Sequence, residues 1–325
     1  MESKFETNKI APVALIFFNR PHTLEKVFNE IKIARPSKLF LIQDGAREDN
    51  INDKKNIEKC LEIVEDIDWE CEVYKNYSEK NLGCGVRPFT GIDWVFSKVD
   101  RAIILEDDCI PSQSFFYFCS ELLEKYLNDN RIFLITGMNM ELETTDCRDS
   151  YFYGFSGTNW GWASWRRCWS NMDYNLDFVK DNEVLKKLSM KLERDSGKKG
   201  LKEIEIFKKT NALIKEGKNI SYWDVQWQAT RYLNNQLSII PAKNLITNIG
   251  VGEGATHAPT YVSKKRKKKE DLQFFFNDRY EITFPLKHPK YMIQNIEYDK
   301  KVDAKLHPHI LKRGKNKVLN FLSKK

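Results

Sequence analysis

Three acidic side chains stand next to one another at Glu106, Asp107 and Asp108, directly after a run of apolar residues. Like charges in contact repel, so three adjacent carboxylates cost stability unless a cation offsets them. Mg²⁺ and Mn²⁺ prefer oxygen ligands, and Mg²⁺ commonly takes one or two carboxylates together with substrate phosphates. A solvated acidic loop is the plain alternative. The position at the end of an apolar strand instead favours a site for a metal and a phosphate-bearing ligand.

Two other predicted strands also end in polar residues. Arg20 follows the apolar run "PVALIFF", and Asp44 follows "KLFLIQ". A single acid at a strand end is commonly a turn former. Here the ends of three strands together provide a cation, a single carboxylate and a cluster of carboxylates. A binding site explains this combination better than three separate turns do. There, Asp44 can accept a hydrogen bond from a nucleobase N–H, and Arg20 can pair with a phosphate or a base carbonyl.

The loop "EKNLGCGVR" contains Gly83 and Gly85, and Arg87 follows them. Glycine lets a backbone approach a phosphate closely, and a nearby Arg adds to that reading. The loop matches neither of the common glycine-rich phosphate-binding motifs. An ordinary turn explains it equally well.

Two residues farther along the chain are candidates for catalysis or metal binding. Asp224 lies between aromatic residues in "SYWDVQW", and a carboxylate beside Trp223 and near Trp227 can have a raised pKa and act as a general base. The simpler reading is a surface Asp at the start of a helix. His257 ends "GVGEGATH" and can ligate a metal or contact a phosphate, although a lone His usually does neither.

The stretch "NWGWASWRRCW" combines tryptophans with glycine. Because the apolar faces of sugars stack on aromatic rings, such a stretch can form a platform for a carbohydrate acceptor. The alternative is a core cluster that takes up some of the rings of Trp160, Trp162, Trp165 and Trp169.

Strand-like and helix-like segments alternate in the N-terminal part of the chain. This alternation predicts an α/β fold, with a parallel sheet and crossover helices. The pattern changes past about residue 145, where aromatic and irregular segments surround two expected helices. The expected strands lie at residues 12–20, 38–45, 70–76, 102–108 and 131–137, and the two later helices at roughly residues 178–193 and 201–216.

The composition is that of a globular chain, with 325 residues and 41% hydrophobic residues. No apolar run approaches the length of a membrane span, and the N-terminus does not read as a secretory signal. Seven scattered cysteines without a CxxC pair favour reduced thiols in a cytosolic protein. The net charge of +7 is concentrated in residues 264–269 and 311–325, a pattern that suits nucleic acid, an anionic membrane or simple solubility.

Six motifs in order carry a resemblance to a known family: "FFNRP", "IQDGA", "KNLGCG", "ILEDDCIPSQSFFYF", "NWGWASWRR" and "YWDVQW". Over roughly residues 10–257 the chain resembles the GT-A-fold glycosyltransferases, most of all the inverting N-acetylglucosaminyltransferase I type and bacterial family 2-like relatives. The resemblance implies a GT-A, Rossmann-like, mostly parallel sheet flanked by helices. It also implies a nucleotide-sugar-binding half at residues 1–145, an acceptor-binding and catalytic half with an aromatic-rich region at 146–260, and a basic extension at 261–325.

The same resemblance implies roles for the acidic triplet, Arg20, Asp44 and Asp224, and the other candidates keep the roles that their residue types suggest. The acidic triplet becomes a variant of the metal-binding DxD motif, in which Asp108 ligates Mn²⁺ or Mg²⁺ on the diphosphate. His257 is a further expected metal residue on its residue type alone. Asp224 matches the catalytic base. The expected donor-binding residues are Arg20, Asp44, Asn81, Gly83, Arg87, Glu106 and Asp107, with Asp44 reading uracil and Glu106 and Asp107 contacting sugar or ribose. The expected acceptor-binding residues are Trp160, Trp162 and Trp223.

The implied activity is transfer of a sugar from a nucleotide diphosphate, UDP by the match, to a hydroxyl of a glycan or lipid-linked acceptor, in surface polysaccharide synthesis. A base opposite the leaving group gives a single displacement with inversion. The expected location is cytoplasmic. In the tail, Val318, Leu319, Phe321 and Leu322 lie among lysines, which suits an interfacial helix at the inner face of the membrane. A solubilising tail explains the same residues equally well.

Two other classes of function remain as alternatives. A nucleotidyltransferase acting on sugar phosphates uses a similar sheet, but it usually needs a Gly/Lys phosphate loop near the first strand, where this chain has "FFNRPHT". A non-enzymatic basic module that binds nucleic acid needs aromatics interleaved with basic residues, whereas "KKRKKK" is one block. The sequence therefore favours an enzyme without nucleic acid as a partner.

Overall fold

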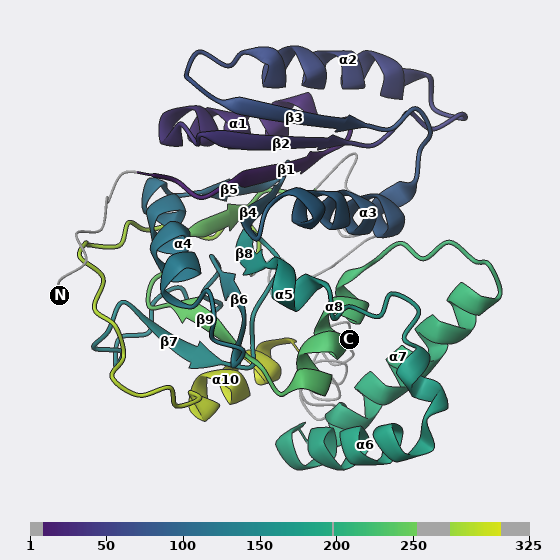
Figure 1. Ribbon diagram of the computed structural model, residues 1–325, viewed down its shortest axis with the longest axis vertical. Helices are drawn as coiled ribbons and strands as arrows, with labels where there is room; N and C mark the ends of the chain where they lie inside the picture. The colour runs from purple at the N-terminus through teal and green to yellow at the C-terminus, as the bar shows by residue number, and fades with distance from the viewer. Residues whose placement is uncertain (1–8, 197, 252–273, 307–325) are drawn as a thin grey trace, which may run out of the picture.

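The computed structural model describes residues 9–196, 198–251 and 274–306. One mixed sheet runs through the described part of the chain, in the order β3-β2-β1-β4-β8-β6-β9-β7 (Figure 1). Its strands are β1 (Val13–Phe17), β2 (Lys38–Gln43), β3 (Glu72–Tyr77), β4 (Arg101–Glu106), β6 (Ile132–Thr136), β7 (Tyr151–Gly154), β8 (Trp162–Trp165) and β9 (Leu237–Pro241).

The first four strands form the parallel part of this sheet. β1 pairs in parallel with both β2 and β4, and β2 pairs in parallel with β3. All five side chains of β1 are buried, as expected for a continuous apolar strand covered on both faces. The connections run through α1 (Pro21–Ala34), α2 (Ile51–Glu65) and α3 (Gly83–Lys98), and α4 (Gln113–Lys125) follows β4. The predicted α/β architecture with helices beside a mostly parallel sheet is confirmed.

The sheet continues without a break past residue 145. β8 lies between β4 and β6 and is antiparallel to both. β9 is parallel to β6, and β7 closes the edge antiparallel to β9. The aromatic stretch that begins at Trp160 therefore enters the sheet as β8 and continues into the short helix α5 (Arg166–Trp169). The two regions separated at residue 145 in the sequence share one sheet.

A helical lobe stands beside the second half of the sheet (Figure 1). It contains η1 (Asp177–Lys180), α6 (Asn182–Ser196), α7 (Lys198–Lys215) and α8 (Asp224–Asn234), and the two predicted helices correspond to α6 and α7. Leu188 and Leu192 of α6 pack with Ile204 and Phe207 of α7 in a small core of their own. Farther along the chain, α10 (Ile296–Leu306) packs on β7, with the rings of Tyr298 and Phe152 4.8 Å apart.

A second, two-stranded sheet joins distant parts of the chain. β5 (Cys109–Pro111) follows the acidic triplet and pairs antiparallel with β10 (Ile246–Asn248). This pairing brings the residues after β10 onto the end of β4. Among the described residues, no helix has the length and apolar character needed to cross a membrane. None of the seven cysteines forms a disulfide.

Candidate active site at the carboxyl end of the sheet

Arg20 lies directly against two acids of the triplet. It stands at the start of α1, just past the end of β1, and its Nη2 bonds to Asp107 Oδ1 and lies 2.9 Å from Asp108 Oδ2. The backbone N–H of Phe18 also donates to Asp107 Oδ2, at 3.3 Å. Neighbouring parallel strands thus bring the predicted cation and the predicted carboxylates together at one edge of the sheet.

The triplet carries more negative charge than Arg20 alone offsets. Asp107 and Asp108 are only 2% and 8% exposed, so water screens their charges weakly. Burial, and then repulsion from Asp108 and Asp107, raises the pKa of Glu106 to about 8. A third carboxylate that is hard to ionise at neutral pH indicates that this place favours an added positive charge.

The donor set fits a divalent cation that is shared with a substrate. In the part of the chain that the structure describes, no three His, Cys, Asp or Glu side chains form a ready-made metal cluster. A complete protein cage is not required, because Mg²⁺ keeps few protein carboxylates and takes phosphate oxygens from the substrate. Asp108 supplies the carboxylate chemistry, and Arg20 now bonds to its Oδ2. His257 lies outside the described residues, so its metal role stays a prediction.

A glycine that the sequence reading missed lies against Asp108. The N–H of Ile249 donates to the carbonyl of Asp108 at 2.9 Å, and the N–H of Gly250 donates to Asn248 Oδ1 at 2.7 Å. A Cβ placed on Gly250 would lie 2.1 Å from Asp108 Oδ2, far closer than atoms in contact allow. The only available signal was the glycine pair in "NIGVG", which has no recognisable motif spacing.

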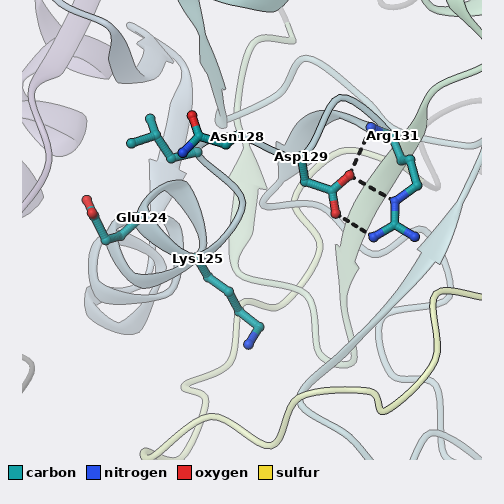
Figure 2. A pocket seen from close by; sticks show the side chains of 6 residues that line it. Glu124, Lys125, Asn128, Asp129 and Arg131 are labelled. Atoms are coloured by element: carbon teal, nitrogen blue, oxygen red, sulfur yellow. Dashed lines mark hydrogen bonds and ion pairs between the residues drawn. The ribbon is translucent and has the colours of Figure 1, made fainter. Parts of the chain in front are cut away.

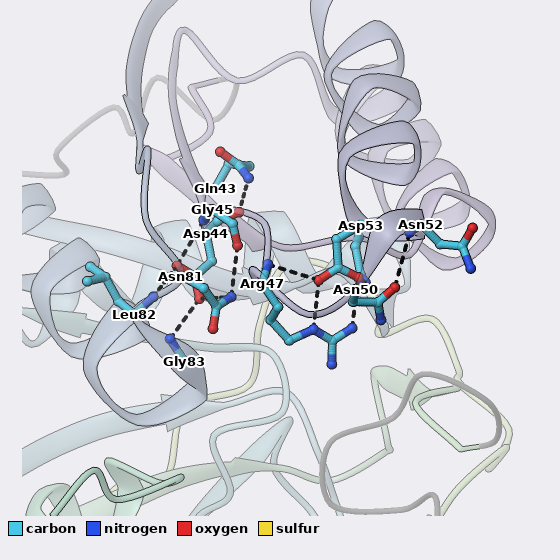
Figure 3. A network of polar contacts seen from close by, with 11 residues as sticks. Gln43, Asp44, Gly45, Arg47, Asn50, Asn52, Asp53, Asn81, Leu82 and Gly83 are labelled. Carbon is cyan, nitrogen blue, oxygen red and sulfur yellow. Dashed lines mark hydrogen bonds and ion pairs between the residues drawn. The ribbon is translucent and has the colours of Figure 1, made fainter.

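Asp44 holds the glycine loop at the start of α3 (Figure 3). Its Oδ1 accepts from the N–H groups of Gly45 at 3.0 Å and Leu82 at 2.8 Å. Its Oδ2 accepts from the N–H of Gly83 at 2.9 Å and from Asn81 Nδ2 at 3.2 Å. A carboxylate has about four acceptor positions, and these bonds fill them. The hydrogen bonds of Asp44 therefore stabilise the conformation of this loop. A contact between Asp44 and uracil stays a prediction.

Arg87 and Asp53 brace the same region. Arg87 is buried and donates from Nε to the Gln43 carbonyl at 3.1 Å and from Nη2 to Asn76, which ties the end of β2 to the end of β3. These contacts are structural, and none points to the predicted donor role. Asp53, which the sequence reading missed, accepts from Arg47 Nε at 2.7 Å and joins the loops after β1 and β2 (Figure 3).

The predicted groups converge around Cys84, near the start of α3. Burial raises the pKa of the Cys84 thiol, and the charges of Glu106, Asp44 and Asp224 raise it further. The thiol also lies 3.0 Å from the Ser221 carbonyl, just before α8. One side chain is therefore within electrostatic range of all three candidate acids. The negative charge of Asp224 also raises the pKa of Glu106, so the start of α8 is within electrostatic range of the acidic triplet.

The surroundings of Asp224 differ from the predicted ones. The sequence suggested a carboxylate enclosed by tryptophans, but Asp224 is exposed at the first position of α8. The rings of Trp223 and Trp227 point inward and are buried. Asp224 is thus exposed to an incoming molecule, and its charge acts on Glu106 at the end of β4. Its role as a base stays a prediction.

The acceptor platform requires a correction. Trp162 is 0% exposed and Trp223 is 5% exposed, and their rings lie 5.8 Å apart in one aromatic core cluster. A sugar can stack only on a ring face that solvent can reach, so the predicted acceptor role does not hold for these two residues. The alternative, a core cluster, describes them. Trp160 is half-buried against Phe275, with ring centres 5.0 Å apart, and it remains a candidate.

A wide surface hollow lies elsewhere, at the end of α4 (Figure 2). It encloses about 420 Å³ and is lined by Glu124, Lys125, Leu127, Asn128, Asp129 and Arg131. Arg131 donates from Nε and Nη2 to the Asp129 carboxylate at 2.9 and 2.7 Å, so the two charges satisfy each other. The hollow precedes β6, at the edge of the sheet opposite the acidic triplet. It adds nothing to the candidate site.

The sequence matches no protein-family model, and it has no significant match among curated proteins. The case for a function therefore rests on the geometry at the carboxyl ends of β1, β2 and β4.

Proposed function

We propose that this chain is a metal-dependent, inverting glycosyltransferase of the GT-A type. It transfers a sugar from a nucleotide diphosphate, with UDP as the proposed nucleotide, to a hydroxyl of a glycan or lipid-linked acceptor. The observation that supports this proposal is the contact of Arg20 with Asp107 and Asp108 at the carboxyl edge of the sheet, with the charge of Asp224 within electrostatic range of Glu106. Open α/β sheets bind their ligands at this edge.

The donor half of the site offers both signs of charge. Asp108 would hold Mn²⁺ or Mg²⁺ together with the diphosphate, and the metal would act as a Lewis acid for charge on the departing phosphate. Arg20 is a guanidinium at the same place, and it can pair with phosphate oxygens once they arrive. Glu106 and Asp107 are the proposed contacts to sugar or ribose.

The acceptor half provides a base. Asp224 is exposed, and its charge is felt at Glu106 and Cys84. In the proposed reaction, its carboxylate takes the proton of the acceptor hydroxyl while that oxygen bonds to the anomeric carbon of the sugar. The bond to the diphosphate breaks on the opposite face, so the configuration inverts. The diphosphate leaves with the bonding electron pair.

The proposed acceptor and location follow from the basic segments of the chain. Residues 264–269 and 311–325 contain basic residues and no acid, so they account for the net positive charge, and they lie outside the described residues. We place the enzyme in the cytoplasm, with these residues in contact with the anionic inner face of the membrane. This location would bring a lipid-linked acceptor within reach.

Calorimetry of UDP binding with and without Mn²⁺ tests the proposal. The Asp108→Ala variant is expected to lose the metal-dependent part of the affinity and all sugar transfer. Asp100→Ala is the matched control, because Asp100 stands at the other end of β4, where its side chain is exposed and pairs with Arg166 at 3.0 Å. Equal UDP affinity in Asp108→Ala and in the wild type would remove Asp108 from the metal site.

Hydrolysis of UDP-sugars in the absence of acceptor distinguishes the reaction classes. Metal-dependent release of UDP supports a glycosyltransferase. Consumption of a nucleoside triphosphate with a sugar 1-phosphate would instead identify a nucleotidyltransferase.

A further inference from the structure

A second cavity lies within the helical lobe, away from the carboxyl edge of β4. It encloses about 200 Å³ between α6, α7, α8, α10 and the loop after β7. Its polar lining includes Glu203, Gln228, Arg231, Tyr232, Asp299 and Asp303. None of Arg20, Asp44, Asp224 and the acidic triplet lines it, so it is separate from the proposed donor site.

Arg231 lines this cavity and carries a buried hydrogen-bond donor without a partner among the described residues. Its side chain is buried, with the residue only 5% exposed. Nη1 donates to Ser238 Oγ at 3.1 Å, and the guanidinium lies 5.5 Å from the centre of the Tyr232 ring. Nε is buried and has no hydrogen-bond partner among the described residues. A buried N–H without a partner is costly, so its presence indicates that something else accepts from it.

Glu203 presents the opposite type of group in the same cavity. Its carboxyl group makes no hydrogen bond or ion pair with the residues that the structure describes. Burial raises its pKa, whereas the nearby charge of Arg231 lowers it, so the two groups are within electrostatic range. The lining of the cavity thus combines a guanidinium N–H with a carboxyl group, neither of which has a hydrogen-bond partner among the described residues.

The charges of Glu203 and Arg231 restrict the class of ligand that this cavity can bind. Glu203 in the lining disfavours an anion, and Arg231 and Lys300 disfavour a cation, whereas Asp195 is already paired with Lys191 and Arg194. A hydroxyl group both donates and accepts, so neighbouring hydroxyls satisfy Glu203 and Arg231 at once. Leu192 and Val302 also line the cavity and offer apolar contact for C–H groups.

We propose that the cavity binds one neutral sugar unit, a hexose or an N-acetylhexosamine. Its hydroxyls would bond to Arg231 Nε and Glu203. This site goes beyond the proposed transfer reaction, since it holds a saccharide that does not react. It would fit a part of a glycan acceptor remote from the hydroxyl that receives the sugar.

Saturation-transfer NMR with methyl glycosides of glucose, galactose, mannose and N-acetylglucosamine tests this site without nucleotide or metal. At least one of them is expected to bind. Glu203→Ala should weaken that binding roughly tenfold or more, the effect of losing a hydrogen bond to a charged group. Glu205→Ala is the matched control, because Glu205 lies on the same helix, is exposed and only approaches Lys208 at 3.4 Å.

Thermal melting shows whether each variant is folded. Glu203→Ala should melt close to the wild type, because the carboxyl group it removes makes no hydrogen bond or ion pair with the described residues. Arg231→Met should also weaken sugar binding, but only Glu203→Ala is decisive if Arg231→Met unfolds. Asp108→Ala should leave sugar binding unchanged, so failure of the donor site and failure of this site give different results.

Three results would overturn the proposal. The first is that none of the four glycosides binds. The second is that a bound glycoside keeps its affinity in Glu203→Ala. The third is that inorganic phosphate displaces the glycoside from the wild type, which would make this an anion site.

Discussion

The two halves of the sheet use their distinctive residues in opposite ways. In the parallel half, from β1 to β4, charged residues stand at the strand ends and meet at one edge, where Arg20 contacts Asp107 and Asp108. In the other half, the distinctive aromatic residues turn inward, and Trp162 and Trp227 are almost fully buried with ring centres 5.5 Å apart. Position in the fold, more than residue type, decides which side chains can meet a ligand.

The halves are nevertheless coupled at the proposed site. The second half supplies Asp224 from the first turn of α8 and Gly250 from the segment after β10. The comparison therefore predicts that polar residues from the second half affect catalysis, whereas its buried aromatics affect stability.

The largest expected effect is on catalysis, from a residue of the second half. Asp224→Asn keeps the size of the side chain and removes its basicity. We expect turnover to fall about 10²–10⁴-fold, the usual contribution of a general base, with UDP affinity unchanged. Steady-state kinetics and calorimetry on the same preparation measure both. Turnover close to that of the wild type would place the base elsewhere and break the proposed coupling.

The next effect is on stability. Trp162→Ala removes a fully buried ring from the aromatic cluster and should lower the free energy of unfolding by about 3–5 kcal/mol. Trp160→Ala, which changes a half-buried ring two residues away, should cost clearly less. Urea denaturation compares the two variants. Equal losses of stability would mean that the buried ring of Trp162 and the half-buried ring of Trp160 contribute equally to the free energy of unfolding.

The smallest expected effect concerns the brace beside the donor site. Asp53→Asn weakens the bonds to Arg47 and should cost about 1–3 kcal/mol. The Arg47 guanidinium holds the pKa of Asp53 below its ordinary value of 3.8. Stability from this ion pair is therefore present above pH 3.8 and is lost as the pH falls through the lower, folded-state pKa.

Urea denaturation between pH 2 and 7 measures this dependence. At the acidic end of this range, the free energy of unfolding of the wild type should approach that of Asp53→Asn. Asp129→Asn, in the hollow at the opposite edge of the sheet, is a comparison with a more exposed ion pair and should cost less. If the difference in free energy of unfolding between the wild type and Asp53→Asn stayed constant with pH, ionised Asp53 would not be the stabilising form.

The regular part of the fold was predictable from local pattern. Continuous apolar runs marked β1, β2, β4 and β6, because strands buried on both faces need no alternation. β8 was missed because "WASW" is four residues long and lies in an aromatic stretch without strand-like boundaries. β5 and β10 were missed because each is three residues long and exists only through pairing with the other. Pairing between distant segments leaves no mark in a local pattern.

The candidate site was predictable to a similar degree. Arg20 and the acidic triplet were found because parallel strands end at one edge, so position along the chain gave position in space. The acceptor roles of Trp162 and Trp223 were wrong because sequence does not show which face of a ring is covered. Arg87 and Asp44 were identified as site residues, yet the visible contacts of both are with the protein backbone and loops.

The contact between Asp108 and Gly250 has a consequence for synthesis on the ribosome. The residues expected to bind the donor lie almost entirely in the first third of the chain, which emerges early. The backbone of Asp108 nevertheless receives its hydrogen bond from Ile249, and β5 finds its partner only in β10. During synthesis, the acidic triplet therefore emerges well before the segment around Ile249 and Gly250 that packs against Asp108. The site becomes complete only after translation has passed Gly250.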